Sequence, residues 1–179
     1  MTRDTNLTHA FRKTAATLAT GTLLATSGSA EAQEARQGTA FGDWLLACEA
    51  VGVNRTSCVI RQTLTRRDGG ALIADVILRR LEAEDDPRIA LVLVTPTGMF
   101  LPEAPGMAID AGGETLPLQW RSCDAQRCVA SRVLTEDDVA SLSGGGRMSL
   151  GYRPVNRDEP VIFSVSLDGV TAGLAALEG

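Results

Sequence analysis

The sequence predicts a mainly β protein, an antiparallel β-sandwich or barrel-like domain of about seven strands with one or two short helices. Two observations carry this prediction: short apolar or alternating runs recur along the chain, and turn-forming residues separate them. The chain has 179 residues, of which 44% are hydrophobic and 4% aromatic. This composition fits one globular domain.

The expected strands are seven runs of suitable length and composition. They cover residues 43–49, 57–66, 71–80, 88–95, 115–122, 147–153 and 160–167. The run 90–94 is apolar throughout, which predicts a central strand covered on both faces or an inner strand of a sandwich. Residues 67–70, with the sequence RDGG, are a strong hairpin signal, so we expect consecutive strands to be mostly antiparallel.

Two helices are expected near the C-terminus. Thr135 and Asp138 have the spacing of a capping box, and the glycines at 144–146 would end the helix that follows. A second helix would start near Asp168, because apolar residues recur after it at helical spacing. This second segment therefore predicts a C-terminal helix that docks on the sheet.

The N-terminal residues 1–32 have the features of a cleavable signal peptide. A basic start precedes a mildly apolar run at 14–25, and Ala30 and Ala32 form an A-x-A cleavage site. The apolar run is shorter than the roughly 20 residues that a membrane-spanning helix needs. We expect cleavage after Ala32, a flexible lead-in at 33–40, a single domain at 41–179, and a periplasmic or secreted mature protein.

Cleavage at this site would change the chemistry available to the chain. It would remove His9 and Lys13, the only histidine and the only lysine, and leave 14 basic against 20 acidic residues, a formal net charge of −6. A negative charge disfavours binding to nucleic acid, and the loss of histidine removes the commonest general base and transition-metal ligand. The sequence therefore predicts a protein without catalytic residues, cofactor or metal.

The four cysteines, Cys48, Cys58, Cys123 and Cys128, all lie in the expected mature domain. Disulfides are the expected state in an exported chain, and four cysteines allow three connectivities. We favour the local pairs Cys48–Cys58 and Cys123–Cys128. A redox pair or a zinc site is the alternative, although neither spacing has the C-x-x-C form that is typical of such sites.

Each of the other candidate sites has a structural interpretation as well as a functional one. Arg66, Arg67, Arg79 and Arg80 form a candidate anion-binding face, or simply a soluble surface. Met99, Phe100 and Leu101 form a candidate interaction loop if they are exposed. The carboxylates at 82–86 and 136–138 are read as a solvated turn and a helix start, and Trp44 and Trp120 as core residues.

Taken together, the motifs resemble the invasion associated locus B family of bacterial exported proteins. The similar stretches are 41–44 with Cys48, Cys58 with 62–64, 96–102 running on to 109–110, Cys123 with 128–130, and 165–169 with the helix after it. The resemblance spans 41 to about 177. The sequence departs from the family pattern at Val170, where an aromatic residue is frequent, and at Thr97, where the family often has leucine.

The resemblance implies an exported, mostly β-structured protein with no established catalytic residues, in a family named for a role in host-cell invasion. We therefore expect a non-catalytic binding or interaction protein that acts on an unknown protein or envelope component. Two other functions remain open from the sequence: a periplasmic enzyme, either a thiol oxidoreductase or a carboxylate hydrolase, and a structural envelope-stress protein.

Overall fold

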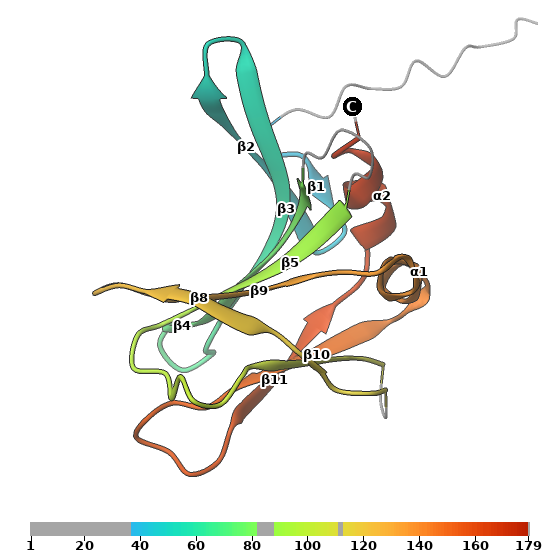
Figure 1. Cartoon of the computed structure of the whole chain (residues 1–179). Coiled ribbons are helices and arrows are strands. Elements are labelled where there is room, and N and C mark those ends of the chain that lie inside the picture. The colour runs from blue at the N-terminus through green and yellow to red at the C-terminus, as the bar shows by residue number, and fades with distance from the viewer. Residues whose placement is uncertain (1–36, 82–87, 111–112, 179) are drawn as a thin grey trace, which may run out of the picture. The chain divides into compact units, whose positions relative to one another are not determined.

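The structure is a computed structural model that describes residues 37–81, 88–110 and 113–178, all of which belong to one compact unit, 33–179 (Figure 1). The described residues form two antiparallel sheets and two short helices. The strands are β1 (Ala40–Phe41), β2 (Trp44–Gly52), β3 (Arg55–Thr65), β4 (Leu72–Leu81), β5 (Arg88–Thr95), β6 (Gly106–Ile109), β7 (Leu116–Pro117), β8 (Gln119–Cys123), β9 (Cys128–Val133), β10 (Arg147–Tyr152) and β11 (Val161–Ser166), and the helices are α1 (Glu136–Gly144) and α2 (Val170–Ala175).

The larger sheet has seven strands in the order β1-β2-β3-β4-β5-β9-β8. Strands β2 to β5 form an antiparallel meander, and the apolar strand β5 lies inside the sheet between β4 and β9. The expected turn at 67–70 joins β3 to β4, where the amide of Arg66 donates to the carbonyl of Ala71 and Gly70 has a φ of 69°. The hairpin prediction is confirmed.

The smaller sheet has four strands in the order β11-β10-β6-β7. The chain passes from this sheet into the larger one almost without interruption, because β7 ends at Pro117 and β8 begins at Gln119. The residue between them, Leu118, is fully buried. The short link joins the two sheets at one corner.

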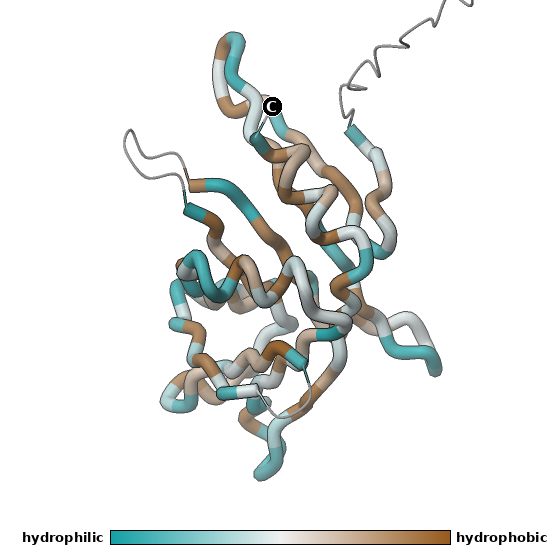
Figure 2. Tube along the Cα trace, turned by 90° about the vertical axis from the view of Figure 1, so that its right-hand side faces the viewer, coloured by the Kyte–Doolittle hydropathy of each residue, from teal (hydrophilic) through white to brown (hydrophobic). Residues whose placement is uncertain are grey.

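A single hydrophobic core holds both sheets and both helices. It lies against one face of the larger sheet. Along β3, β4 and β5, buried residues that point into the core alternate with exposed or half-buried residues, as expected for strands buried on one side. The fully buried large side chains are Trp44, Leu46, Ile60, Val76, Leu78, Leu91, Leu93, Met107, Leu118, Leu142, Met148 and Leu150. In Figure 2, hydrophobic (brown) and hydrophilic (teal) residues follow one another closely along the trace.

The two helices begin as the sequence predicts. Thr135 caps α1: its side-chain oxygen accepts from the amide of Asp138 at 3.1 Å, and the Asp138 carboxylate accepts from the amide of Thr135 at 3.0 Å. In α2, Val170 and Leu174 are buried, and the backbone of Gly173 lies against Ile60 of β3. The C-terminal helix is therefore docked on the larger sheet, and the described residues contain no helix long and apolar enough to cross a membrane.

Two backbone segments from opposite ends of the domain meet in a tight contact. Gly42 and Gly169 both have positive φ values, 53° and 83° respectively. A Cβ added to Gly169 would lie 2.1 Å from the carbonyl oxygen of Phe41, and one added to Gly42 would lie 2.6 Å from that of Asp168. Only glycine fits such an approach, and the contact fixes α2 against the start of β2.

The mainly β, antiparallel architecture with a C-terminal helix confirms the predicted fold class. The predicted number of strands was too low, because β6 and β9 did not stand out in the sequence and the run 115–122 divides into β7 and β8. The paired backbone also begins before Phe41: Ala40 belongs to β1, and the amide of Gly38 donates to the carbonyl of Leu46.

Candidate interaction surface

Both disulfides join neighbouring strands. Cys48 of β2 is bonded to Cys58 of β3, and Cys123 of β8 is bonded to Cys128 of β9, as the sequence favoured. In each case the two cysteines are direct cross-strand partners in the register of the sheet. The structure describes no free cysteine, so these residues form staples within hairpins and supply no reduced thiol.

The first disulfide supports a part of the β2–β3 hairpin that projects beyond its neighbours in the sheet (Figure 1). β3 pairs with β4 only from Val59 onward, so residues 48–58 form a ribbon of two strands. Two-stranded ribbons are marginally stable in water. The tip of the ribbon carries the exposed side chains of Val51 and Val53.

The loop that contains Met99, Phe100 and Leu101 is fixed on the protein and does not present all three side chains. Met99 is only 7% exposed and belongs to the core, whereas Leu101 is 49% exposed. The Phe100 ring stacks on the guanidinium of Arg153 at 4.0 Å. Of the three residues proposed for an interaction loop, the structure leaves Leu101 as the exposed aliphatic one.

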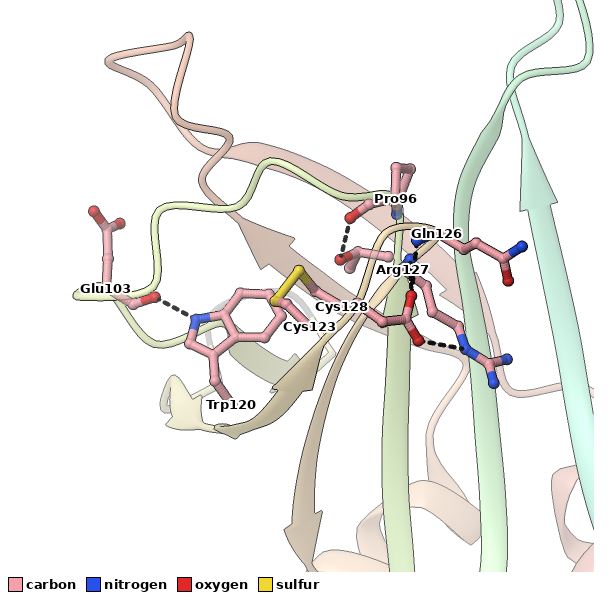
Figure 3. Close-up of a disulfide and its surroundings, with 9 residues drawn as sticks. Pro96, Glu103, Trp120, Cys123, Gln126, Arg127 and Cys128 are labelled. Carbon is pink, nitrogen blue, oxygen red and sulfur yellow. Dashed lines mark hydrogen bonds and ion pairs between the residues drawn. A yellow bond between two sulfur atoms is a disulfide. The ribbon is translucent and has the colours of Figure 1, made fainter.

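Two further contacts hold the next part of this loop. Arg153 forms an ion pair with the carboxylate of Glu103 at 3.2 Å. Trp120 of β8 donates its indole N–H to the backbone carbonyl of Glu103 at 3.0 Å, and Figure 3 shows this ring beside the Cys123–Cys128 disulfide. Trp120 therefore has a positioning role for the loop in addition to its packing on the core.

The fixed loop forms one wall of a groove on the outward face of the smaller sheet. The floor consists of small residues that face each other across β6 and β10: Gly106 is opposite Gly151, and Ala108 is opposite Ser149. Because these side chains are small, they leave an open cavity of about 280 Å³ above the sheet. The residues around it include Glu103, Ala104, Thr115, Pro160 and Ile162.

The groove is mainly apolar and has few groups for acid–base chemistry. Ile162 is 70% exposed at its edge, and Glu103 is the one carboxylate among the lining residues. Tyr152 also borders the groove, but its hydroxyl donates to the carbonyl of Ile73 at 2.8 Å and burial raises the pKa of the phenol. The carboxylate of Glu103 is itself engaged in the ion pair with Arg153.

The four arginines of the candidate anion-binding face are not brought together. Arg79 is opposite Val59, whereas Arg66 precedes the turn and Arg67 is its first residue, at the other end of the β3–β4 pair and seven or more residues away. Arg66 is also paired with Asp68 at 2.5 Å, and this hydrogen bond lowers the pKa of the Asp68 carboxyl. A strand rises about 3.3 Å per residue, so the pairs of arginines are roughly 20 Å apart and do not form one site.

The acidic clusters do not form a site in the described structure. Residues 82–86 lie outside the described residues, and the carboxylate of Asp138 is used in the cap of α1. Within the described ranges, no group of three or more histidine, cysteine or acidic side chains is arranged to hold a metal ion. Trp44 is buried in the core, as expected, and its indole N–H donates to the carbonyl of Ser166.

The comparisons with known proteins agree on one family. The model of the "Invasion associated locus B (IalB) protein" family matches residues 44–178. The chain belongs to the invasion associated locus B family. Two proteins of Brucella abortus, from strain 2308 and from biovar 1 strain 9-941, are each named "Invasion protein B homolog" and are 27% identical to it over 140 residues, 77% of each chain.

A solved structure supports the fold of this family member. The crystal structure of invasion associated protein B from Bartonella henselae superposes with a TM-score of 0.65 at 18% identity, and the match covers 78% of this chain and 94% of that one. The stretches of sequence that resemble the family also have structural roles here. Residues 41–44 and 167–169 meet in the glycine contact, and 96–102 form the loop beside the groove.

The groove itself was missed in the sequence. Its floor comes from β6 and β10, and β6 is a short strand that the alternation did not reveal. The available signal was the set of glycine, alanine and serine residues at alternate positions, Gly106 with Ala108 and Ser149 with Gly151. Such a pattern identifies an outward face only after the register between the strands is known.

Proposed function

We propose that this protein is an exported, non-catalytic binding module, and that its groove takes an apolar segment of a protein partner at the bacterial envelope. The observation that carries the proposal is the open groove of about 280 Å³, with its floor of small residues, the exposed Ile162 on one side and the fixed loop on the other. Open apolar concavities with few polar groups are typical binding sites.

Export is part of the proposal and has two supports. The N-terminal residues have the pattern of a signal peptide with a cleavage site after Ala32. Both cysteine pairs are disulfide-bonded in the structure, and disulfides persist in oxidising compartments such as the periplasm or the extracellular medium. The expected location is therefore the periplasm or the medium.

The absence of catalysis is proposed from the chemistry of the groove. After cleavage, the chain would have no histidine and no lysine. The carboxylate of Glu103 is paired with Arg153, and the disulfides leave no described cysteine to act as a thiolate. A hydrolase would need two convergent acids, and an oxidoreductase an exposed reactive cysteine.

The names of the relatives bear on where the partner is found. Proteins of Brucella and Bartonella that resemble this chain are named for invasion. A role in host-cell invasion is therefore one setting in which such a groove would act. The chemistry of the groove is the same for a partner in the bacterial envelope, which is the partner we propose.

Photocrosslinking in the producing cell tests this function. We would replace Ile162, at the edge of the groove, with a photoreactive amino acid, and use Val53 as a matched control because it is an exposed aliphatic residue on the distant hairpin tip. The proposal predicts a discrete adduct from position 162 that Ala108→Phe, which fills the groove, abolishes. The exposed control Ala125→Phe should leave it unchanged.

Three results would contradict the proposal. One is no adduct from position 162 to a protein other than a second copy of the chain, another is the same adduct from position 53, and the third is an adduct to such a partner that Ala108→Phe does not weaken. Circular dichroism and the thermal midpoint of each variant verify that the fold is intact. The mass of the adduct distinguishes a partner protein from a second copy of the chain.

A further inference from the structure

Strand β11 lies at the edge of the smaller sheet and pairs with β10 alone. The backbone groups of alternate residues in such a strand point toward the neighbour and toward the open edge. The amide of Leu167 donates to the carbonyl of Gly146 on the β10 side, which places the odd-numbered residues of β11 toward β10. Ile162, Ser164 and Ser166 therefore direct their backbone groups to the open edge.

Only some of the outward backbone groups of β11 already have hydrogen-bond partners. The amide of Ser166 donates to the side-chain oxygen of Gln62, and its carbonyl accepts from Trp44 and Gln62 of the larger sheet. At the other end, Pro160 has no amide hydrogen to donate. Within the part of the chain that the structure describes, the outward backbone groups of Ile162 and Ser164 have no hydrogen-bond partner.

The composition of β11 does not protect this edge. Proteins usually shield edge strands with charges, prolines or bulges. Residues 161–166, VIFSVS, contain neither a charged residue nor a proline, and their pairing with β10 has no bulge. The side chain of Ile162 is 70% exposed, and that of Phe163 is half-buried against Tyr152, with ring centroids 5.9 Å apart.

We propose that β11 pairs with β11 of a second copy of this chain, in an antiparallel register centred on Phe163. A two-fold axis at Phe163 sets Ile162 opposite the second copy's Ser164, and Ser164 opposite the second copy's Ile162. Each of these two pairs exchanges two backbone hydrogen bonds, so four groups on each edge become satisfied. The two smaller sheets then form one continuous sheet.

This register is favoured because the residues that cannot form backbone hydrogen bonds across the new edge fall opposite each other. Pro160, which lacks an amide hydrogen, is set against the second copy's Ser166, whose backbone groups are already bonded to Gln62 and Trp44. No hydrogen bond is lost at that point. The two Phe163 rings also become cross-strand neighbours on the axis, which covers the half-exposed part of each ring.

A second copy fits this edge better than an unrelated strand, because its own β11 supplies the residues that match in this register, with Pro160 opposite Ser166. The two-fold pairing occupies the β11 edge of each copy, so the assembly closes at the dimer, as isologous interfaces do. The grooves of the two copies come to lie on one extended sheet, on either side of the axis. The pairing does not depend on the partner proposed for the groove.

Ser164→Pro tests the pairing with little disturbance of the fold. The amide that it removes points to the open edge, where proline is tolerated, and the ladder to β10 is kept. Two of the four hydrogen bonds disappear in the symmetric dimer, at about a factor of five each, so the dissociation constant should rise roughly thirtyfold. Ser164→Ala is the matched control, because it loses the hydroxyl that accepts from Arg147 but keeps the amide.

The measurement is sedimentation equilibrium of the chain isolated from the exporting cell, over micromolar to millimolar concentration. The proposal predicts a reversible dimer that Ser164→Pro weakens and Ser164→Ala does not. Hydrogen exchange of the unmodified protein gives a second readout that needs no variant: the amides of Ile162 and Ser164 should become protected as concentration rises. A monomer at every concentration, or a dimer in which these amides stay unprotected, would overturn the proposal.

Discussion

Single glycines determine how the two ends of the domain meet. At Gly42 and Gly169 the backbone has positive φ and passes so close to another segment that any side chain would meet a carbonyl oxygen. These glycines belong to two of the stretches that carry the family resemblance, 41–44 and 165–169. The resemblance therefore reflects, in part, a contact that the fold requires.

A matched pair of substitutions separates backbone strain from the close contact. Gly38 has a φ of 84° with no atom within 4 Å of an added Cβ, whereas Gly169 has a φ of 83° and an added Cβ would lie 2.1 Å from the Phe41 carbonyl oxygen. Gly38→Ala should lower the free energy of unfolding by about 1 kcal/mol, from the left-handed conformation alone. Gly169→Ala should lower it by roughly 3 kcal/mol or more.

Urea denaturation followed by tryptophan fluorescence measures both values, since Trp44 is buried in the core near this contact. Equal losses of stability in the two variants would show that the close approach is not a constraint. In that case the start of β2 and the start of α2 would move apart at little cost.

For single residues, the sequence indicated which side chains bond to each other better than it indicated which ones are buried. Three connectivities of the cysteines were open from the sequence, and the local pairs that it favoured are the ones in the structure. The Thr135 cap followed from its spacing to Asp138. The burial of Met99 did not follow, because three consecutive apolar residues in a loop give no indication of which one points inward. That direction depends on the bridge from Met99 to Pro154, a contact distant in sequence.

Among the elements, the two disulfide-bonded hairpins differ in how the rest of the structure supports their strands. The β2–β3 ribbon has no third strand beside residues 48–58, so the Cys48–Cys58 bond compensates for missing neighbours. The Cys123–Cys128 bond closes a shorter loop at the end of β8 and β9, where Asp124 already accepts from the amides of Gln126 and Arg127. We expect the two staples to have different local effects.

Replacing Cys48 and Cys58 together with alanine should lower the free energy of unfolding by about 3 kcal/mol in the loop-entropy estimate, against about 2 kcal/mol for the Cys123 and Cys128 pair. The larger difference is local: amide hydrogens in 49–57 should exchange rapidly without the first disulfide, since a lone ribbon is marginally stable. Hydrogen exchange resolved by residue checks this. Unchanged protection at 49–57 would contradict it.

The elements that the sequence missed are the short ones. β6 has four residues, GMAI, and its place in the sheet depends on pairing with β10, far along the chain. β9 starts at a cysteine directly after a turn, so its alternation is brief. Long meander strands such as β3 and β4 were predicted because their periodicity extends over ten or more residues.

The whole molecule combines two sheets of one family fold with two proposed contact surfaces. The chain belongs to the invasion associated locus B family, and the proposed module binds through the groove of its smaller sheet while its β11 edge joins a second copy. The proposed function places the chain outside the cytoplasm. Export and oxidation are therefore the claim on which that function depends.

The mass of the protein recovered from fractions of the producing bacterium, with and without reduction, tests this claim most directly. We expect a chain in the periplasm or the medium that begins at Gln33 and has no free thiol, with peptides that link Cys48 to Cys58 and Cys123 to Cys128. A chain that stays in the cytoplasm with its first 32 residues and reduced cysteines would contradict it.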